Sequence, residues 1–527
     1  MDKKIQLLIP MSGQGTRYQA AGYLEPKPLI PINGTPMIQR LLENFPESWP
    51  CFFVMAENHK NTELPTVLSK ERPQGKQIFI EKHNQGPGFA ALKAMEFLDP
   101  EAPVFLSYCD YAMVWDGVRF SNFVRETECD ACVISYRGYH AHYRSPLQYA
   151  YSRMEGERVV EVKEKGSFTE NREQEFASSG GYYFKSAKLL REAIEYQITN
   201  KIQLNGEYYS SLTVQSLLQM RSNAHVRVFE IPGFFQWGTP EDLRIFEYWE
   251  KSLKDHNRFL GMQRGEVDQV LMPMAGLGSR FASVTSCPKP FIPISGTPMY
   301  QRALETLPKS KTSVLVTLDS VKSYLSGSKE KIVSLKQTPS GQALSTEFGI
   351  TALDLKKEVI VSSCDHGIVL DPRLWNRFKA HPDCDAAIFT IKGYPGADSH
   401  PKAFAYVESD NQGDYPQVKK VSVKSPLSKN PSKDSLLVGT FWFRNIEILA
   451  QGIQELKKQE ILVNGEMYLD SVFEVLIKQG FRVREIPLTG YLCWGDPDSL
   501  AEALYWQEIF GGYHFEPRTK FSKEITK

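Results

Sequence analysis

A glycine-rich loop, followed by an arginine and by a lysine held between prolines, occurs twice in this chain. The first copy reads MSGQGTRYQAAGYLEPKPLIPINGTPM at residues 11–37, and the second reads MAGLGSRFASVTSCPKPFIPISGTPM at residues 274–299. Glycines let backbone N–H groups approach phosphate oxygens closely, and arginine adds a forked, permanent positive charge. Proline fixes φ, so the lysine comes from a stiff segment. Together these residue types predict a cradle for a polyphosphate.

The residues around the loop exclude two common phosphate-binding motifs. The third glycine of the dinucleotide fingerprint G-x-G-x-x-G is replaced by Tyr18 in the first copy and by Phe281 in the second. The Gly-Lys-Ser/Thr that closes a P-loop is missing from both copies. A glycine pair alone indicates only a tight turn, so the prediction depends on the arginine and lysine that follow.

The similarity between the two halves extends far beyond the loop. SYCDYAMVWD (107–116) matches SSCDHGIVLD (362–371), LNGEYYSS (204–211) matches VNGEMYLD (463–470), and EIPGFFQWGTPEDL (230–243) matches EIPLTGYLCWGDPDSL (485–500). The matches keep the same order and nearly the same spacing, and two long repeats indicate tandem domains rather than a solenoid. We therefore expect one domain at residues 1–255 and a second at residues 266–527.

Each half alternates between short apolar runs and helical patterns. IQLLIPM and QVLMPM are expected to be strands that enter the glycine loops. Thr35-Pro36 and Thr297-Pro298 predict a helix N-cap followed by proline at the first helical position. The alternation predicts an α/β fold, with a mixed but mainly parallel sheet covered on both faces. Ligands of such sheets bind at the carboxyl ends of the strands, where the glycine loop and Asp110 are expected to lie.

The series of motifs resembles that of the sugar nucleotidyltransferases, the nucleoside-diphosphate-sugar pyrophosphorylases. The resemblance rests on G-x-G-[TS]-R-[FY], on the Pro-Lys-Pro segment ending in G-x-P-M, on NGEYY and on WGTPED, and it covers almost all of each half. It is greatest to cytidylyltransferase-like members of surface-polysaccharide (capsule) pathways. It implies a Rossmann-like, GT-A-like fold. It also implies nucleotidyl transfer from an NTP, with CTP favoured, to a sugar-1-phosphate or similar metabolite, with release of pyrophosphate and a need for Mg²⁺.

The resemblance also implies roles for individual residues in both halves. The catalytic cations would be Arg17, Lys27, Lys165, Arg280 and Lys289. The nucleotide would be held by Gly13, Gly15, Thr16, Gly86, Gly276, Gly278, Ser279 and Gly341. The acceptor would be bound by Glu164, Gly181, Glu207, Lys424, Gly439 and Glu466, and the metal by Asp110 and Asp365.

These residue types suit the reaction on chemical grounds as well. An acceptor phosphate oxygen attacks the α-phosphorus in line while pyrophosphate leaves. Both reactants are anions, so catalysis consists mainly of charge neutralisation and alignment. Cations and a carboxylate that holds a metal are needed, whereas a nucleophilic serine or cysteine is not.

The second half departs from the pattern more than the first. Its acceptor glutamate is replaced by Val423 although Lys424 remains, and Gly180-Gly181 is expected to correspond to Val438-Gly439. We therefore expect the first domain to be the catalyst, while a catalytic, regulatory or structural role stays open for the second. In both halves a second metal-binding aspartate of the family is missing, with Gln236 and Cys493 near its place. Asp496 is interpreted as an N-cap before Pro497.

Composition narrows the function classes. A formal net charge of zero argues against a nucleic-acid partner, and no apolar run approaches the roughly 18 residues that span a bilayer. Eight cysteines in 527 residues form no disulfide framework, which favours a cytoplasmic protein. Homo-oligomerisation is left open. Two alternatives remain: a GT-A glycosyltransferase, which would carry Asp-x-Asp where this chain has Cys109-Asp110-Tyr111, and a nucleotide-binding regulatory protein.

Overall fold

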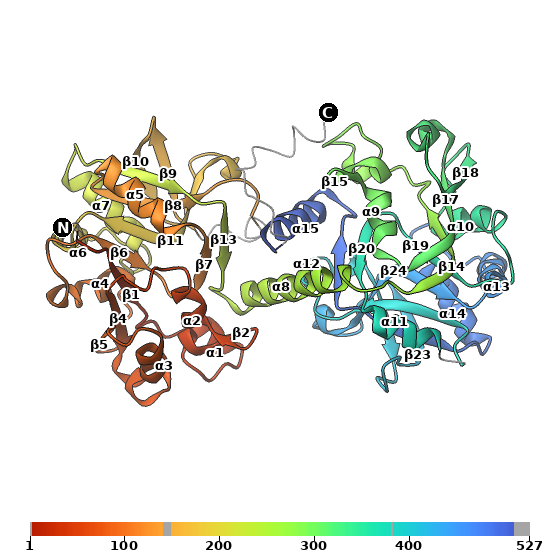
Figure 1. Ribbon diagram of the computed structural model, residues 1–527, viewed down its shortest axis with the longest axis horizontal. Coiled ribbons are helices and arrows are strands. Elements are labelled where there is room, and N and C mark those ends of the chain that lie inside the picture. The colour runs from red at the N-terminus through yellow and green to blue at the C-terminus, as the bar shows by residue number, and fades with distance from the viewer. Residues whose placement is uncertain (1–2, 141–148, 381–382, 511–527) are drawn as a thin grey trace. The chain divides into compact units, whose positions relative to one another are not determined.

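The computed structural model describes residues 3–140, 149–380 and 383–510, and it divides into two compact units. Among the described residues these units comprise 3–247 and 248–510 (Figure 1). The division falls inside one helix, α8 (Pro240–Leu260), which continues past residue 255. The domain boundaries expected at residues 255 and 266 therefore stay predictions. No helix in the described part of the chain is long and apolar enough to cross a membrane.

The first unit is built around a nine-stranded mixed sheet. Its parallel part has the order β6–β1–β4–β5, formed by β1 (Gln6–Pro10), β4 (Cys51–Ala56), β5 (Lys76–Ile80) and β6 (Val104–Ser107). The antiparallel strand β11 (Phe176–Phe184) lies beside β6 and also pairs with β8 (Ala131–Tyr136) and β9 (Tyr151–Glu155). The outer strands are β10 (Arg158–Lys163) beside β9 and β12 (Val226–Glu230) beside β8. The predicted fold class is confirmed.

The apolar side chains of this sheet alternate between two cores because successive residues of a strand point to opposite faces. Leu7 and Ile9 belong to one core, while Leu8 between them belongs to the other. The first core is completed by α2 (Met37–Leu42), α3 (Leu64–Glu71) and α5 (Gly117–Thr127). The second is completed by α4 (Gly86–Leu92), α6 (Ala187–Thr199) and α7 (Ser210–Met220). Burial on both faces explains why these strands read as continuous apolar runs.

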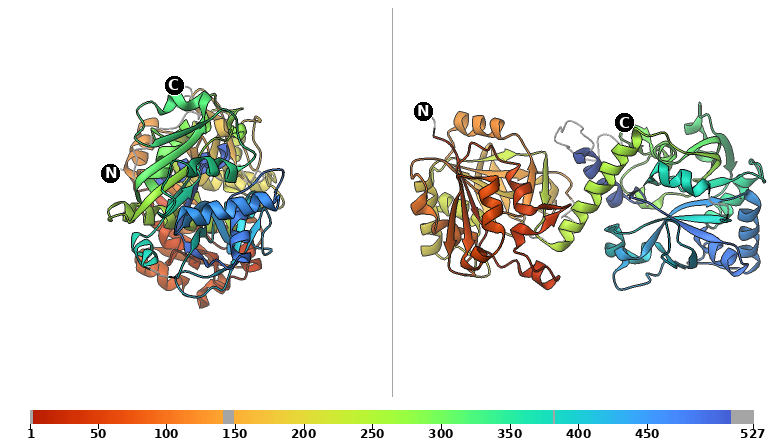
Figure 2. Two further views of the ribbon diagram at one scale, coloured as in Figure 1. Left: turned by 90° about the vertical axis from the view of Figure 1, so that its right-hand side faces the viewer. Right: turned by 60° about the horizontal axis from the view of Figure 1, so that its bottom comes forward.

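The second unit repeats this topology strand for strand. Figure 2 shows that each unit contains a sheet with helices packed beside it. Its parallel strands are β14 (Glu266–Pro273), β17 (Lys309–Leu318), β18 (Lys331–Leu335) and β19 (Val359–Ser362). They are followed by β24 (Ser435–Phe443), β21 (Ala386–Ile391), β25 (Val483–Pro487), β22 (Ala405–Ser409) and β23 (Val418–Val423). The main helices are α9 (Met299–Thr306), α10 (Gln342–Ile350), α11 (Pro372–Lys379), α13 (Ile446–Lys458), α14 (Asp470–Lys478) and α15 (Pro497–Phe510).

The helix caps predicted at the two Thr-Pro pairs are wrong. Thr35–Pro36 forms the short strand β3, which pairs with β2 (Pro31–Ile32), and α2 begins at Met37 without a side-chain cap. Asn33 and Gly34 between these strands both have positive φ, as a two-residue hairpin turn requires. The hairpin therefore uses the residues that a cap would need. In the second unit β15 (Pro293–Ile294) and β16 (Thr297–Pro298) pair in the same way.

Candidate active site

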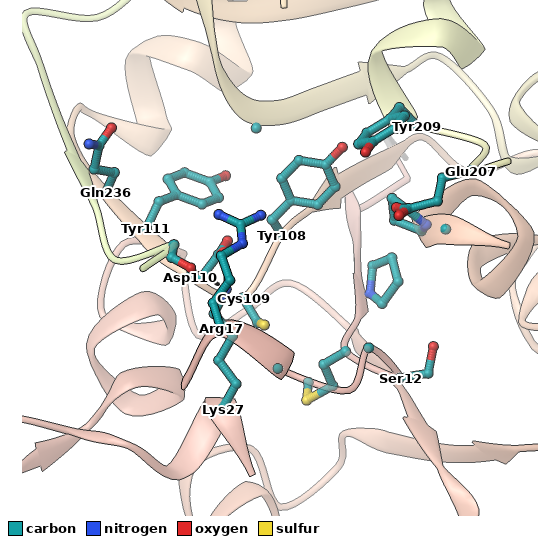
Figure 3. Close-up of a pocket in the computed structure, with 18 of the residues that line it drawn as sticks. Ser12, Arg17, Lys27, Tyr108, Cys109, Asp110, Tyr111, Glu207, Tyr209 and Gln236 are labelled. Carbon is teal, nitrogen blue, oxygen red and sulfur yellow. Dashed lines mark hydrogen bonds and ion pairs between the residues drawn. The ribbon is translucent and has the colours of Figure 1, made fainter. Parts of the chain in front are cut away.

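A cavity of about 660 Å³ in the first unit gathers most of the residues predicted for the site. Figure 3 shows Arg17 extending into it beside Asp110, Tyr108 and Tyr111. The predicted residues that line it are Gly13, Gly15, Thr16, Arg17, Lys27, Gly86, Asp110, Glu164, Lys165 and Glu207. They come from loops at the carboxyl ends of the strands and from the turn before α7. Residues as far apart in the sequence as Gly13 and Glu207 are thus brought to one place.

The two glycines of the loop have different functions. Gly15 adopts φ +61°, and a Cβ atom on it would lie 3.2 Å from Cβ of Lys27. It therefore lets the Pro-Lys-Pro segment pack directly against the loop in a left-handed conformation that favours glycine. A Cβ atom on Gly13 would meet nothing within 4 Å, so this backbone faces open space. Gly278 of the second unit repeats the geometry of Gly15, with φ +64° and a Cβ position 2.7 Å from Cβ of Lys289.

Lys27 is held at the base of the cavity by two contacts. Its ammonium group forms an ion pair with Asp110 and donates to the carbonyl oxygen of Gly238 at 3.3 Å. An ammonium group has three N–H donors, so these contacts orient Lys27 and leave a third donor for a ligand. In the second unit Lys289 contacts Asp365 at 2.6 Å and the carbonyl oxygen of Gly495 at 3.1 Å.

In the second unit, the ion pair between Lys289 and Asp365 contributes to a lowered pKa of the Asp365 carboxyl. Burial opposes ionisation of Asp365, but Lys289 and the neighbouring His366 outweigh it and hold the pKa of this carboxyl well below its usual range. A carboxylate that stays ionised beside a lysine keeps both charges fixed in the cavity wall. The predicted phosphate-binding lysine and the predicted metal-binding aspartate therefore contact each other in both units.

The carboxylates of the first unit fit a magnesium ion whose shell is completed by other ligands. A Cβ atom on Gly238 would lie 3.6 Å from Oδ2 of Asp110 and 3.7 Å from Oδ2 of Asp242, so both carboxylates flank this glycine. Asp242 also accepts from the Thr239 backbone N–H at 3.0 Å, as part of the helix cap. No group of three or more His, Cys, Asp and Glu suited to a metal occurs among the described residues. Mg²⁺ commonly binds one or two carboxylates together with waters and substrate phosphates.

The residues predicted to bind the acceptor include a carboxyl group and an ammonium group that follow each other in the chain, Glu164 and Lys165. Glu164 accepts a 2.5 Å hydrogen bond from the hydroxyl of Ser211, and burial raises the pKa of Glu164 to about 7. Lys165 adopts φ +52°, and its ammonium group donates to the hydroxyl of Tyr209 at 2.9 Å. Tyr108, Tyr149 and Tyr182 also line the cavity. Tyr108 and Tyr149 were not predicted from the sequence, because in a linear sequence they look like ordinary core residues.

Gly181, which was predicted to bind the acceptor, does not line the cavity, whereas the preceding residue Gly180 does. A Cβ atom on Gly181 would lie 2.8 Å from the Phe105 ring, so this residue faces the core, whereas Gly180 (φ +97°) lines the cavity. Strand register places Gly181 opposite Ser107, and Thr440 opposite the equivalent Ser362. Gly439, whose φ is also positive, therefore corresponds to Gly180 rather than to Gly181. The pairing of β11 with β8 shifts register just before this point, which the sequence does not reveal.

The corresponding cavity of the second unit is smaller, at about 280 Å³. The predicted residues that line it are Gly276, Gly278, Ser279, Arg280, Lys289, Gly341, Asp365 and Glu466. Lys424 and Gly439 lie outside its lining. Lys424 instead donates to the carbonyl oxygen of Ala403 at 2.9 Å, and its ammonium group lies 5.3 Å from the centre of the Tyr468 ring. The structure thus brings together the residues of this unit that were predicted to bind the nucleotide, and it leaves two of those predicted to bind the acceptor outside the cavity.

The second unit nevertheless keeps an acid near Lys424, which the sequence analysis missed. Val423 occupies the position of Glu164, but Asp470 occupies the position of Ser211, the residue that hydrogen-bonds Glu164. Burial raises the pKa of Asp470 to about 6, and Lys424 opposes this shift. The acid of the second unit is therefore at the position of the hydrogen-bonding serine of the first unit. The alignment of NGEYYSS with NGEMYLD contained this signal at its last residue.

The turn glycines predicted to contact the base have a structural explanation of their own. Gly86 has φ +85°, and a Cβ atom on it would lie 2.9 Å from the backbone nitrogen of Tyr208. Gly341 has φ +118°, and its Cβ would lie 2.5 Å from that of Met467. The N–H of Gly88 donates to the carbonyl oxygen of Tyr208 at 2.8 Å. The fold therefore requires glycine at both turns whether or not a base is bound there.

The interpretation of Asp496 as an N-cap is confirmed. Its Oδ1 accepts from the backbone N–H of Ser499 at 2.9 Å, at the start of α15. Its carboxylate also lies 3.9 Å from the guanidinium of Arg280, a contact between partly exposed groups. In the first unit the hydroxyl of Thr239 accepts from the N–H of Asp242 at 3.1 Å. The helix after each Trp-Gly is thus capped from the equivalent position.

Comparisons with known proteins found similar solved structures and a matching family model. A solved nucleoside-diphosphate-sugar pyrophosphorylase from Vibrio cholerae RC9 is 16% identical, with a TM-score of 0.38 over 46% of this chain and 99% of that one. An inositol-1-phosphate CTP transferase from T. maritima is also 16% identical, with a TM-score of 0.37 over 46% and 98%. No curated protein matches the chain. The model of the MobA-like NTP transferase domain matches residues 7–169 and 271–419, which is more than half of the chain. The chain therefore belongs to the MobA-like NTP transferase family and carries two tandem copies of its domain.

Proposed function

We propose that the first unit transfers a nucleotidyl group from an NTP to a sugar-1-phosphate or similar phosphorylated metabolite and releases pyrophosphate. Membership of the family makes the chain a nucleotidyltransferase. The observation that carries the finer proposal is that one cavity contains the glycine loop, the Lys27–Asp110 pair and the Glu164–Lys165 pair. The reaction brings a triphosphate and an acceptor phosphate together, and each of these anions needs a cation within the same cavity. The preference for CTP and a cytoplasmic role in surface-polysaccharide synthesis rest on the sequence resemblance.

In this proposal the residues of the first unit have the following roles. Backbone N–H groups from Gly13 to Thr16 bind phosphate oxygens, and the Arg17 guanidinium reaches the same anion from the cavity side (Figure 3). The third N–H of Lys27 donates to the leaving pyrophosphate. Lys165 draws the acceptor phosphate towards the α-phosphorus. Fixed donors of this kind lower the barrier because they are aligned before charge develops in the transition state.

The residues at the metal position have a related task in this proposal. Asp110 would hold Mg²⁺, with Asp242 as the nearest second carboxylate. When bound, the ion would neutralise charge on the triphosphate oxygens. Lys27 orients the Asp110 carboxylate through their ion pair. The Lys27 ammonium group and the Asp110 carboxylate would therefore act together in binding the phosphates.

The second unit is proposed to bind an NTP and to take a different acceptor. The contacts of Lys289 with Asp365 and with the Gly495 carbonyl oxygen match those of Lys27, which supports nucleotide binding. The smaller cavity and the position of Lys424 outside its lining support an altered acceptor site. The acid at Asp470 supports a site that has changed rather than one that has decayed.

Calorimetry with Mg²⁺ and each of CTP, UTP, dTTP, GTP and ATP tests the proposal. We expect two sites on the intact chain, one lost in Lys27→Ala and the other in Lys289→Ala. Lys188→Ala, which removes an exposed lysine of α6, serves as the matched control and should keep both sites. For an acceptor that supports turnover, Lys27→Ala should lower pyrophosphate release on the order of 10²–10³-fold. Absence of binding to all five nucleotides would contradict the proposal.

A further inference from the structure

Two carboxyl groups and one ammonium group lie close together in the cavity of the first unit. Glu164, Lys165 and Glu207 all line this cavity. Burial raises the pKa of Glu164, Lys165 lowers it and Glu207 raises it, so the three charged groups interact. Lys165 follows Glu164 in the chain, yet its ammonium group donates to the hydroxyl of Tyr209 at 2.9 Å. Negative charge therefore exceeds positive charge around Glu164 before any acceptor binds.

Binding of the acceptor phosphate would increase this excess of negative charge. In the proposed function Lys165 binds that phosphate, and a phosphate monoester carries a charge of about −1.5 to −2 at pH 7. The carboxyl groups of Glu164 and Glu207 would then lie beside an anion whose charge exceeds that of the one ammonium group. Like charges in a partly buried wall disfavour ionisation. Glu164 must therefore either take up a proton or meet a positive group on the acceptor.

Two aromatic rings lie near the Glu164 carboxyl and favour the second alternative. Tyr108 and Tyr182 line the cavity, and their rings meet edge to face with centroids 6.3 Å apart. Burial raises the pKa of both hydroxyls and the charge of Glu164 adds to this rise, so both rings lie near this carboxyl. Gly180 makes room for one ring, since a Cβ atom there would lie 2.8 Å from Cδ2 of Tyr108. Faces of aromatic rings attract cations.

The protein already places one ammonium group against a ring in this part of the cavity. Nζ of Lys165 lies 4.8 Å from the centre of the Tyr209 ring. Figure 3 shows the Tyr108 hydroxyl directed towards Tyr209, with Glu207 beside them. Rings and carboxylates together suit a cationic group, because the rings attract it and a carboxylate supplies the opposite charge. A neutral hydroxyl would leave the charge of both carboxylates in place.

We propose that the acceptor of the first unit carries an ammonium group close to its phosphate, and that Glu164 and the rings of Tyr108 and Tyr182 bind this ammonium group. The inference rests on the proposed function of the first unit and names its class of acceptor. The phosphate would contact Lys165 and the ammonium group the residue before it, so only a few atoms separate the two groups. Aminoalkyl phosphates and amino-sugar 1-phosphates both have this chemistry.

Calorimetry with matched pairs of acceptors tests the inference. The full chain with Lys289→Ala, which removes the proposed second nucleotide site, is saturated with Mg²⁺ and an α,β-methylene analogue of the NTP that it binds. Phosphoethanolamine is compared with propyl phosphate, in which a methyl group replaces the ammonium group, and glucosamine-1-phosphate is compared with glucose-1-phosphate. In at least one pair we expect the ammonium compound to bind about 10–30-fold more tightly. The pair that shows this preference identifies an alkyl or a sugar acceptor.

Variants of the binding residues separate recognition of charge from recognition of hydroxyl groups. Glu164→Gln should bring the preferred pair within about threefold, because its amide carries no charge. Tyr108→Leu should reduce the preference, whereas Tyr108→Phe keeps the ring and should retain it. If Glu164 binds hydroxyl groups instead, Glu164→Gln will weaken both members of each pair by the same factor. Glu126→Gln, at an exposed position of α5, is the matched control and should leave every affinity unchanged.

The outcomes also separate this inference from the proposed function. Equal affinities within both pairs, tighter binding of the neutral members, or no binding of any of the four acceptors would overturn the inference while leaving nucleotide binding intact. A preference that survives unchanged in Glu164→Gln would refute the role of this carboxyl. Failure of every NTP to bind the intact chain would overturn the proposed function itself.

Discussion

Glu164 should make the stability of the first unit depend on pH in an unusual direction. Its pKa is raised from 4.5 to about 7 in the folded protein, chiefly by burial and against the opposing hydrogen bond from Ser211. Between these two pKa values the folded state binds more protons than the unfolded state. The free energy of unfolding contributed by this carboxyl therefore falls as pH rises from 4.5 to 7. Each pKa unit corresponds to about 1.4 kcal/mol, so the loss is at most about 3 kcal/mol.

The perturbation that isolates this effect is Glu164→Gln. The amide oxygen of glutamine can still accept the hydrogen bond from Ser211, but the side chain cannot ionise. At pH 8 the variant should be more stable than the wild type by up to about 3 kcal/mol, and this advantage should shrink towards zero at pH 4.5. The variant should also lose turnover if the carboxylate contacts the acceptor.

Urea denaturation at several pH values between 4.5 and 8.5, followed by tryptophan fluorescence, measures the effect. Glu126→Gln, at an exposed position of α5, is the matched control and should shift stability equally at all pH values. A stability difference for Glu164→Gln that stays constant across this range would refute the reasoning. So would a variant that becomes less stable, relative to the wild type, as pH rises.

Three further predictions concern single residues. Asp470→Asn should remove the equivalent pH dependence from the second unit between pH 3.8 and about 6, and urea denaturation that shows no such change would contradict it. Gly341→Ala should lower the free energy of unfolding by about 1–3 kcal/mol, because φ is +118° and the added Cβ would crowd Met467. Gly276→Ala, whose Cβ would meet open space, should lower it less, and thermal denaturation measures both changes. Thr239→Ala should cost about 1 kcal/mol through loss of the α8 cap, measured by denaturation, and an unchanged midpoint would argue against the cap.

The architecture could be predicted because it depends on local and periodic signals. The apolar runs of β1 and β14 are recognisable as strands since both faces of a parallel sheet are buried. The Thr35–Pro36 hairpin was mispredicted as a helix cap because threonine followed by proline suits both structures. Pairing with Pro31–Ile32 decided between them, and that pairing depends on two neighbouring residues in positive φ.

The candidate site was predicted only where it consists of short motifs. The positions of Lys27 and Asp110 followed from their neighbours, but their ion pair joins residues 83 positions apart. The change of position of the acid, from Glu164 in the first unit to Asp470 in the second, involves two motifs that are far apart in the sequence. The sequence could not show that Gly180 rather than Gly181 lines the cavity, because neighbouring residues of a strand face opposite sides and the pairing of β11 shifts register between Ser178 and Tyr182.

The chain alone establishes the types of chemistry, since glycine and proline restrict the backbone locally and the charge of a lysine does not depend on its neighbours in space. It also establishes the duplication, because a repeat is a property of order along the chain. The fold decides which groups meet, how far burial shifts the pKa of Glu164, and which glycine faces a ligand. These properties depend on strand register and on exclusion of water, and both arise only when distant segments pack together.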